Sequence, residues 1–199
     1  MPRDVERTKL RLQTAATVEF AEHGLHGTTV ERIAVRAGVN EERIYAYFGD
    51  KSALFAVVIR LELSKLARAV PLVVTSDWDA GEFAGDAFDY QQTHPHLARL
   101  LLWEELTDTG IVPDEVARSV LYADKIRTLA RAQREGLIDD ALDPDYLMFL
   151  LIALASWWSA APQLARMMFT GDPTDSGERA RRRQAVVLAG RRISARPFT

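Results

Sequence analysis

Apolar residues recur at every third or fourth position along most of this chain, which is the period of helices that bury one face. No segment alternates apolar and polar residues between hairpin turns, as half-buried strands do. The pattern therefore predicts an all-α fold. The predicted helices cover about residues 5–23, 51–69, 82–93, 96–107, 113–135, 144–161 and 178–195, with two shorter helices between residues 28 and 48.

Residues that favour helix ends flank several of these segments. Asp50 stands where it can cap the helix that follows it, and Gly24 stands where it can end the first helix. Pro113 can occupy the first turn of its helix, and Gly136 follows the end of the same helix. The composition changes near residues 51–70, which predicts a small N-terminal domain joined by a helix to a larger helical domain.

Composition narrows the possible classes of protein. Hydrophobic residues make up 48% of the chain and charged residues 27%, which is typical of a folded globular protein. There is no cysteine, so disulfides and thiolate metal sites are excluded. The longest apolar run, residues 146–161, is shorter than the roughly 20 residues of a membrane-spanning helix. The charged start lacks the apolar segment of a secretory signal, so we expect a cytoplasmic protein with no membrane partner.

Patterns of catalytic and metal-binding residues are missing from the sequence. The histidines form two close pairs, His23 with His26 and His94 with His96. Neither pair has a carboxylate at the spacing of a metal site or a catalytic triad. The glycines are scattered and form no phosphate-binding loop. We therefore expect no catalytic residue, no enzyme activity, no cofactor and no metal.

The stretch TTVERIAVRAGVNEERIYAYFGDKSALF, residues 28–55, has the pattern of two short helices joined by a tight turn. Thr28 and Glu31 have capping-box spacing at the start of the first helix. Gly38 can adopt the left-handed conformation of the turn, and Asn40 can cap the second helix. Such a pair is a helix-turn-helix, whose second helix enters the DNA major groove, although similar hairpins also occur in structural bundles.

The same stretch closely resembles the N-terminal signature of TetR/AcrR-like transcriptional regulators, over about residues 8–60. The resemblance implies a three-helix helix-turn-helix DNA-binding domain (residues 1–50) and a larger helical ligand-binding and dimerisation domain (residues 51–199). Departures from the signature occur at Gln13, Thr17 and Glu19, where aliphatic residues are common, and at the acidic start of the recognition helix. The matching positions are Phe20-Ala21, Gly24, Thr28-Thr29, Ile33-Ala34, Ala37-Gly38-Val39, Ile44-Tyr45-x-Tyr47-Phe48, Lys51 and Leu54.

The resemblance also implies a function. The expected protein is a homodimeric repressor that a small-molecule effector releases from a palindromic double-stranded DNA operator, and it would associate with the nucleoid when bound. A ligand-responsive activator and a helical interaction protein without specific DNA binding remain as alternatives. Basic and acidic residues balance over residues 1–55, so DNA binding must depend on where individual charges lie.

The predicted DNA contacts fall into two groups. Hydroxyls, helix N-termini and a lysine suit phosphate contacts, which position a protein without reading sequence. Base reading falls to the first turn of the recognition helix, because Arg can pair with guanine and Glu can accept from the cytosine amine. For the glutamates the alternative is stabilisation of the helix dipole, and for Arg43 it is contact with phosphate or a Glu. The predicted phosphate contacts are Thr28, Thr29, Tyr45, Tyr47 and Lys51, and the predicted base contacts are Asn40, Glu41, Glu42 and Arg43.

Large apolar side chains on several helices are candidates for a ligand site. Glu104 lies near the apolar face of its helix and could contact a cationic or hydroxylated ligand. The alternative is that these side chains form the core and that Glu104 marks its polar boundary. The remaining candidates are Phe88, Trp103, Tyr122, Phe149, Trp157 and Met167.

The helix over residues 144–161 is apolar on every face, so every face should be covered. Because it is too short for a membrane, we expect a second subunit to cover it together with the last helix. The alternative is that this helix forms the centre of a monomeric core. The predicted interface residues are Leu151, Ala155, Trp158, Val186, Leu188 and Ile193.

Overall fold

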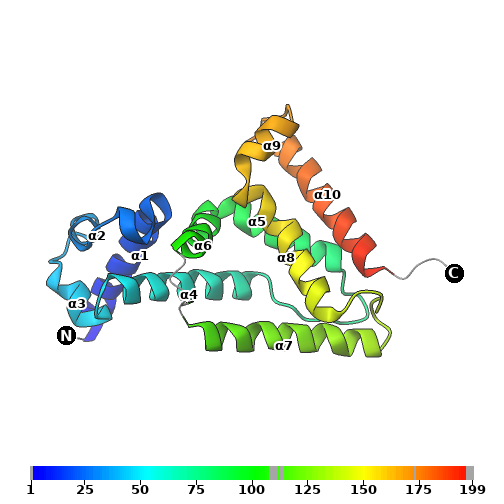
Figure 1. Cartoon of the computed structure of the whole chain (residues 1–199), viewed down its shortest axis with the longest axis horizontal. Helices are drawn as coiled ribbons and strands as arrows, with labels where there is room; N and C mark the ends of the chain where they lie inside the picture. The colour runs from blue at the N-terminus through cyan, green and yellow to red at the C-terminus, as the bar shows by residue number, and fades with distance from the viewer. Residues whose placement is uncertain (1, 108–111, 113, 173, 196–199) are drawn as a thin grey trace. The chain divides into compact units, whose positions relative to one another are not determined.

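The computed structural model describes residues 2–107, 112, 114–172 and 174–195. These residues form ten helices and no strand (Figure 1), which confirms the predicted all-α class. Several predicted bounds agree closely with the structure, although the predicted start at Pro113 lies outside the described residues. The helices are α1 (Pro2–Gly27), α2 (Val30–Ala37), α3 (Glu42–Phe48), α4 (Lys51–Ala69), α5 (Ala80–Thr93), α6 (Pro95–Thr107), α7 (Glu115–Arg134), α8 (Pro144–Ala160), α9 (Pro162–Met168) and α10 (Ser176–Ser194).

The chain divides into two compact units. The N-terminal unit comprises residues 1–65 and 95–115, and the C-terminal unit comprises residues 66–94 and 116–199. Because α6 belongs to the N-terminal unit, this unit contains more of the chain than the helix-turn-helix alone. The predicted division of the chain after residue 50 stays a prediction.

The N-terminal unit has its own hydrophobic core, to which α1, α2, α3, α4 and α6 all contribute. Phe20 of α1 meets Phe55 of α4 edge to face, with ring centroids 5.0 Å apart. Ile44, the one fully buried residue of α3, anchors the recognition helix to this core. The rotation of α3 about its own axis is therefore fixed relative to the core, and with it the direction in which its exposed residues point.

The turn between α2 and α3 forms as expected, but the cap of α2 is shifted by one residue. Gly38 has the predicted left-handed conformation (φ 63°). Thr29, and not Thr28, caps α2 by accepting from the backbone N–H of Arg32 at 3.2 Å. The predicted capping box of Thr28 with Glu31 is wrong, because the Thr28 hydroxyl is turned to a buried partner in α1.

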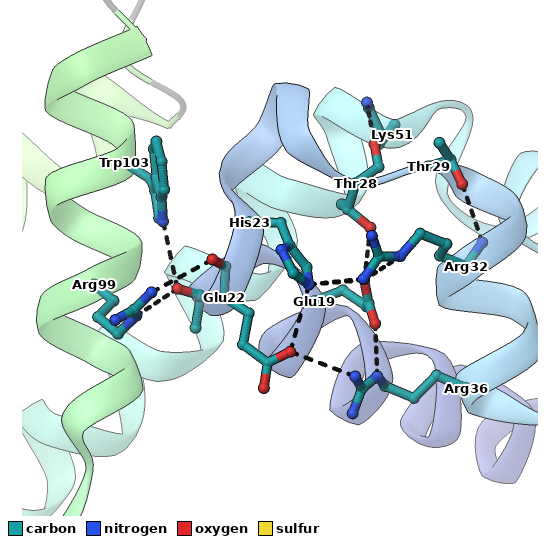
Figure 2. Close-up of polar contacts among 11 residues, drawn as sticks. Glu19, Glu22, His23, Thr28, Thr29, Arg32, Arg36, Lys51, Arg99 and Trp103 are labelled. Carbon is teal, nitrogen blue, oxygen red and sulfur yellow. Dashed lines mark hydrogen bonds and ion pairs between the residues drawn. The ribbon is translucent and has the colours of Figure 1, made fainter.

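The helical backbone of α1 is interrupted at Gly24, where the first helix was expected to end, and a short further helical stretch to Gly27 follows across the kink. The kink is at Gly24 itself, where φ is 70° and ψ is 179°. Beside it, the carbonyl of Ala21 accepts from Nε of Arg99 at 2.6 Å and from Nε1 of Trp103 at 3.3 Å (Figure 2). Two side chains of α6 thus satisfy a backbone acceptor next to the break in α1.

In the C-terminal unit, α5 packs against both α8 and α10. One face of α5 carries Phe88 into the core, while its small residues let α10 approach closely. A Cβ atom on Gly190 of α10 would lie only 2.8 Å from Cα of Gly81 in α5. Ion pairs flank this contact, with Arg183 bridging three carboxylates of α5 and Arg191 pairing with Asp79 at 2.6 Å.

The short helix α9 was not predicted, because Pro162 was taken only as the end of the preceding helix. Pro162 does end α8, but it also occupies the first position of α9, where its missing N–H is not needed. The axes of α8 and α9 are bent by 81°. No single helix in the described part of the chain is long and apolar enough to cross a membrane, and only this bent pair together meets the length and composition required.

Candidate nucleic-acid interface

The first turn of the recognition helix exposes all four predicted base-reading residues. Oδ1 of Asn40 accepts from the backbone N–H of Glu42 at 2.9 Å in the turn before α3, but the cap position of α3 is Glu41, one residue later than predicted, and the Glu41 side chain makes no capping hydrogen bond. Its Nδ2 lies 3.5 Å from Oε2 of Glu42, which ties that carboxylate back toward the turn. Glu41 has no hydrogen bond or ion pair from its carboxylate within the described residues.

Arg43 and Tyr47 lie one helical turn apart on the same face of α3. Nη1 of Arg43 donates to the Tyr47 hydroxyl at 3.3 Å, and its Cζ lies 6.0 Å from the ring centroid. Nζ of Lys9, from α1, lies 5.9 Å from the same centroid. Tyr45 projects into solvent, whereas Tyr47 is half-buried. The structure thus gathers a lysine and an arginine around one ring of the recognition helix.

The predicted phosphate contacts Thr28, Thr29 and Lys51 lie together where α2 and α4 begin. Thr28 is 1% exposed, and its hydroxyl donates to Oε2 of Glu19 at 2.8 Å. Its carbonyl accepts from Nζ of Lys51, also at 2.8 Å. Phosphate binding by this group stays a prediction, and the Thr28 hydroxyl would reach DNA only by leaving Glu19.

Glu19 is the centre of a polar network between α1 and α2, shown in Figure 2. It is 3% exposed and accepts from Nε of Arg36 at 2.8 Å, while Nε of Arg32 lies 3.2 Å away. Nη2 of Arg32 also lies 2.7 Å from Nε2 of His23, which must accept because a guanidinium only donates. The network fixes α2 against α1 by charge as well as by apolar packing.

The environment of Glu19 keeps its carboxylate charged. Burial alone would raise the pKa of Glu19. Hydrogen bonds from Thr28 and Arg36, with the charges of Arg32 and Arg36, outweigh burial and hold the pKa below its ordinary value. The oxygens of Glu19 and Glu22 and a ring nitrogen of His23 lie within 4.8 Å of one another, a spacing that a metal ion could use. The guanidiniums of Arg32 and Arg36 already bind these carboxylates, so the arrangement fits an ion-pair network better than a metal site.

Two basic residues that support the site were not singled out in the sequence. Nη2 of Arg11 in α1 donates to the carbonyl of Gly38 at 3.1 Å and so braces the turn before α3. Arg36 holds Glu19 from α2. Neither role has a local signal, because Arg11 and Gly38 are brought together only by the packing of α1 on the turn.

The predicted ligand residues differ widely in their surroundings. In the C-terminal unit, Phe88 is fully buried and packs edge to face against Trp158, with ring centroids 6.2 Å apart. In the N-terminal unit, Trp103 lies against the α1 kink, and Glu104 is half-buried on the same helix. The other four are exposed: Tyr122, Phe149, Trp157 and Met167.

An open cavity of about 550 Å³ lies between α5, α10 and the end of α4, within the C-terminal unit. Asp86, Asp89, Arg179 and Arg183 line it and are joined to one another by ion pairs. None of the predicted ligand residues lines this cavity. Its charged walls also differ from the aromatic site that was predicted.

The predicted dimer residues lie mostly inside the C-terminal unit. Leu151, Ala155 and Val186 are at most 2% exposed and belong to the core of that unit. Trp158 and Ile193 pack against the same core, whereas Leu188 is exposed on α10. The face of α8 that was assigned to the partner subunit is therefore the one that packs within the chain. Which residues contact a partner stays a prediction.

The opposite face of α8 is apolar and exposed. Tyr146 is 62% exposed, Phe149 71% and Trp157 61%. These positions follow helical spacing, so they form one row along the helix. We call this row, completed by Leu150 and Ile152, the outer row of α8.

A helix-turn-helix with an exposed recognition helix, followed by a larger helical unit, is the architecture typical of a DNA-binding transcriptional regulator. Two family models match the chain: "Bacterial regulatory proteins, tetR family" over residues 12–58 and "Tetracyclin repressor-like, C-terminal domain" over residues 79–192. The chain belongs to the TetR family of transcriptional regulators, which confirms the resemblance seen in its sequence.

Relatives with similar length support this assignment. The chain is 40% identical to the HTH-type transcriptional repressor SCO4008 of Streptomyces coelicolor, over 96% of the chain and 97% of that protein. It is 28% identical to the HTH-type transcriptional regulator RutR of Escherichia coli, over 81% of the chain and 79% of RutR. The crystal structure of the Streptomyces coelicolor protein SCO4942 superposes with a TM-score of 0.81 at 34% identity, covering 96% of the chain and 99% of that structure.

Proposed function

We propose that the chain is a homodimeric repressor that leaves a palindromic operator when a small molecule binds. The relative that is 40% identical to it is named a repressor, which supports repression over activation. A ligand-responsive activator of the same architecture is the alternative. A reporter gene behind the operator separates the two, because loss of the regulator raises expression under a repressor and lowers it under an activator.

The outer row of α8 is the observation that carries the proposed homodimer. A helix on the outside of a monomer normally has one apolar face and one polar face. Here α8 buries one apolar row in its own unit and exposes a second, with Phe149 near its middle. In a two-fold symmetric dimer, the outer row of one subunit would pack against the outer row of the other. Exposed Leu188 of the neighbouring α10 would extend the contact.

Sedimentation tests the homodimer. Wild-type protein should run at about twice 22.3 kDa at micromolar concentration. Phe149→Glu should give monomers that keep their helical content, because this side chain is exposed within its own chain. Val116→Glu is the matched control, since Val116 is 81% exposed on α7 and lies outside the outer row. A monomeric wild type would contradict the proposal.

Operator binding is tested by selection from a random pool of duplexes with the purified protein. A dimer should enrich a pseudo-palindrome with half-sites about one helical turn apart or somewhat more. Affinity should fall as salt rises, because phosphate contacts release counterions. Failure to enrich any sequence would favour the alternative, a helical interaction protein without specific DNA binding.

We also infer that the effector is a small molecule, although its site is predicted from the sequence only. Thermal shift with a lipophilic library, with and without operator DNA, is the direct test. An effector should stabilise the free protein more than the operator-bound protein, with a coupling of about 1–3 kcal/mol. A compound that stabilises both states equally is not the effector.

The proposed repressor has no enzyme activity and acts in the cytoplasm, bound to the nucleoid through its operator. Membership of a family of regulators supports both statements. Fractionation of cells that contain a tagged chain tests the location, and recovery in the membrane pellet would contradict it.

A further inference from the structure

Tyr47 links the core of the N-terminal unit to the exposed face of the recognition helix. Its ring is half-buried and packs against the core cluster. It meets the neighbouring ring of Phe48 edge to face, with centroids 6.4 Å apart and an interplanar angle of 84°. Packing against the core and against Phe48 restricts rotation of the Tyr47 ring, so its hydroxyl has a fixed position beside α3.

Arg43, one helical turn before Tyr47, contacts the Tyr47 hydroxyl. Its guanidinium donates to the Tyr47 hydroxyl at 3.3 Å and lies 6.0 Å from the ring centroid. An arginine otherwise samples many rotamers on an exposed helix face. Contact with a fixed phenol restricts these rotamers before DNA arrives, so less freedom is lost when the guanidinium meets a base.

The other candidate base readers are held differently. The side-chain oxygen of Asn40 accepts from the backbone N–H of Glu42 in the turn before α3, and the Glu42 carboxylate is tied back to Asn40. Of the four, Arg43 is the one whose charged tip is held by an aromatic residue of the described chain. Lys9 adds a second positive charge near the same ring, at 5.9 Å from its centroid.

We propose that Tyr47 is the positioning residue for Arg43: it orients the guanidinium that reads a base, and so controls sequence discrimination. This inference rests on the proposed operator binding. A tyrosine hydroxyl that donates only to phosphate would strengthen binding to every sequence alike. A positioning hydroxyl strengthens binding to one base pair in each half-site. The two roles therefore differ in which operators they favour.

A double-mutant cycle on purified dimer separates these roles. Dissociation constants are measured for the selected operator and for each single-base variant, with wild type, Arg43→Ala, Tyr47→Phe and the double variant. Arg43→Ala should lose roughly 5- to 150-fold of discrimination at one base pair. Tyr47→Phe should lose about two- to tenfold at the same base pair. In a protein that already carries Arg43→Ala, Tyr47→Phe should not reduce discrimination at that base pair any further.

Tyr45→Phe is the matched control. It removes a hydroxyl from the same helix that makes no hydrogen bond within the described residues, and it should leave discrimination at the Arg43 base pair unchanged. Unfolding in urea checks that each variant is folded. Phenylalanine keeps the Tyr47 ring, so its core packing should survive.

Three results would overturn the inference, and they are distinguishable. A loss with Tyr47→Phe that is equal for all operator variants and persists without Arg43 would make Tyr47 a phosphate contact. An unchanged ranking of operators with Arg43→Ala would show that Arg43 reads no base, while operator binding itself stands. A wild type that prefers no sequence would overturn both this inference and the proposed operator binding.

Discussion

Gly24 and Trp103 lie in direct contact, so that a Cβ atom on Gly24 would stand 2.7 Å from Cδ2 of the indole ring. The contact joins the kink of α1 to α6 at the point where Trp103 donates to the carbonyl of Ala21. Glycine is needed there for space and also for its backbone, since φ is 70°. At this point the indole of α6 therefore packs directly on the backbone of α1, beside the hydrogen bonds that Arg99 and Trp103 donate to it.

Gly24→Ala should destabilise the protein by about 2–4 kcal/mol, because the methyl group meets the indole and the backbone is strained. Urea unfolding followed by circular dichroism measures the loss. Gly49→Ala is the control: its φ of 88° is also unfavourable for alanine, but nothing lies within 4 Å of the added Cβ. Equal losses from the two variants would show that the contact with Trp103 contributes nothing.

Gly190→Ala should destabilise the C-terminal unit by about 1–3 kcal/mol, since the added methyl would force α10 away from α5. The control is Gly177→Ala in the exposed first turn of the same helix. Alanine favours helix over glycine, but a Cβ on Gly177 would lie 3.2 Å from Oδ1 of Asp175, which caps α10, so this variant should change stability by less than about 1 kcal/mol. Thermal melts should thus show a clear loss for Gly190→Ala and little change for Gly177→Ala, and equal losses would contradict the close packing.

Acid should weaken the Glu19 network. The pKa of Glu19 in the folded protein is below its ordinary value of 4.5, so its contribution to stability is fully present above that value. The contribution is lost as pH falls through the lower, folded pKa. At neutral pH, Glu19→Gln should cost about 1–3 kcal/mol, and its difference from wild type should shrink as the pH falls below 4.5. Urea unfolding at several pH values tests this, and a constant difference would contradict it.

Glu41→Gln should strengthen binding to non-operator DNA several-fold, because a carboxylate at the start of the recognition helix repels phosphates. The ratio of operator to non-operator affinity should fall at the same time. Glu31→Gln is a control with an equal change of charge on α2, outside the recognition helix. Loss of helix stability without any change in DNA affinity would instead support the alternative, in which Glu41 only stabilises the helix dipole.

Features set by local chemistry could be predicted from the sequence. Helix α4 begins and ends where it was predicted, because Asp50 caps its first turn by accepting from the N–H of Ala53 at 2.7 Å. The turn at Gly38 and the all-α class depend on similarly local signals. The family signature is of this kind as well, since its spacings lie within one continuous stretch.

Features decided by tertiary contacts could not be predicted. Thr28 and Thr29 are both suitable caps for α2. Thr29 takes this role because the Thr28 hydroxyl donates to buried Glu19, which lies nine residues earlier in the sequence. A helix that is apolar all round does not reveal which face turns inward. For α8 that choice is made by α5 and α10, which bury Leu151 and leave Phe149 exposed.

The spacing of Arg43 and Tyr47 also bears on the redesign of operator preference. A library that varies position 43 alone would offer every new side chain the same phenol, which is placed for a guanidinium. Shorter or acidic side chains would then leave that hydroxyl without its present neighbour. Positions 43 and 47 should therefore be varied together. Libraries that vary both positions should yield more proteins that discriminate strongly in favour of a new operator than libraries that vary positions 43 and 46.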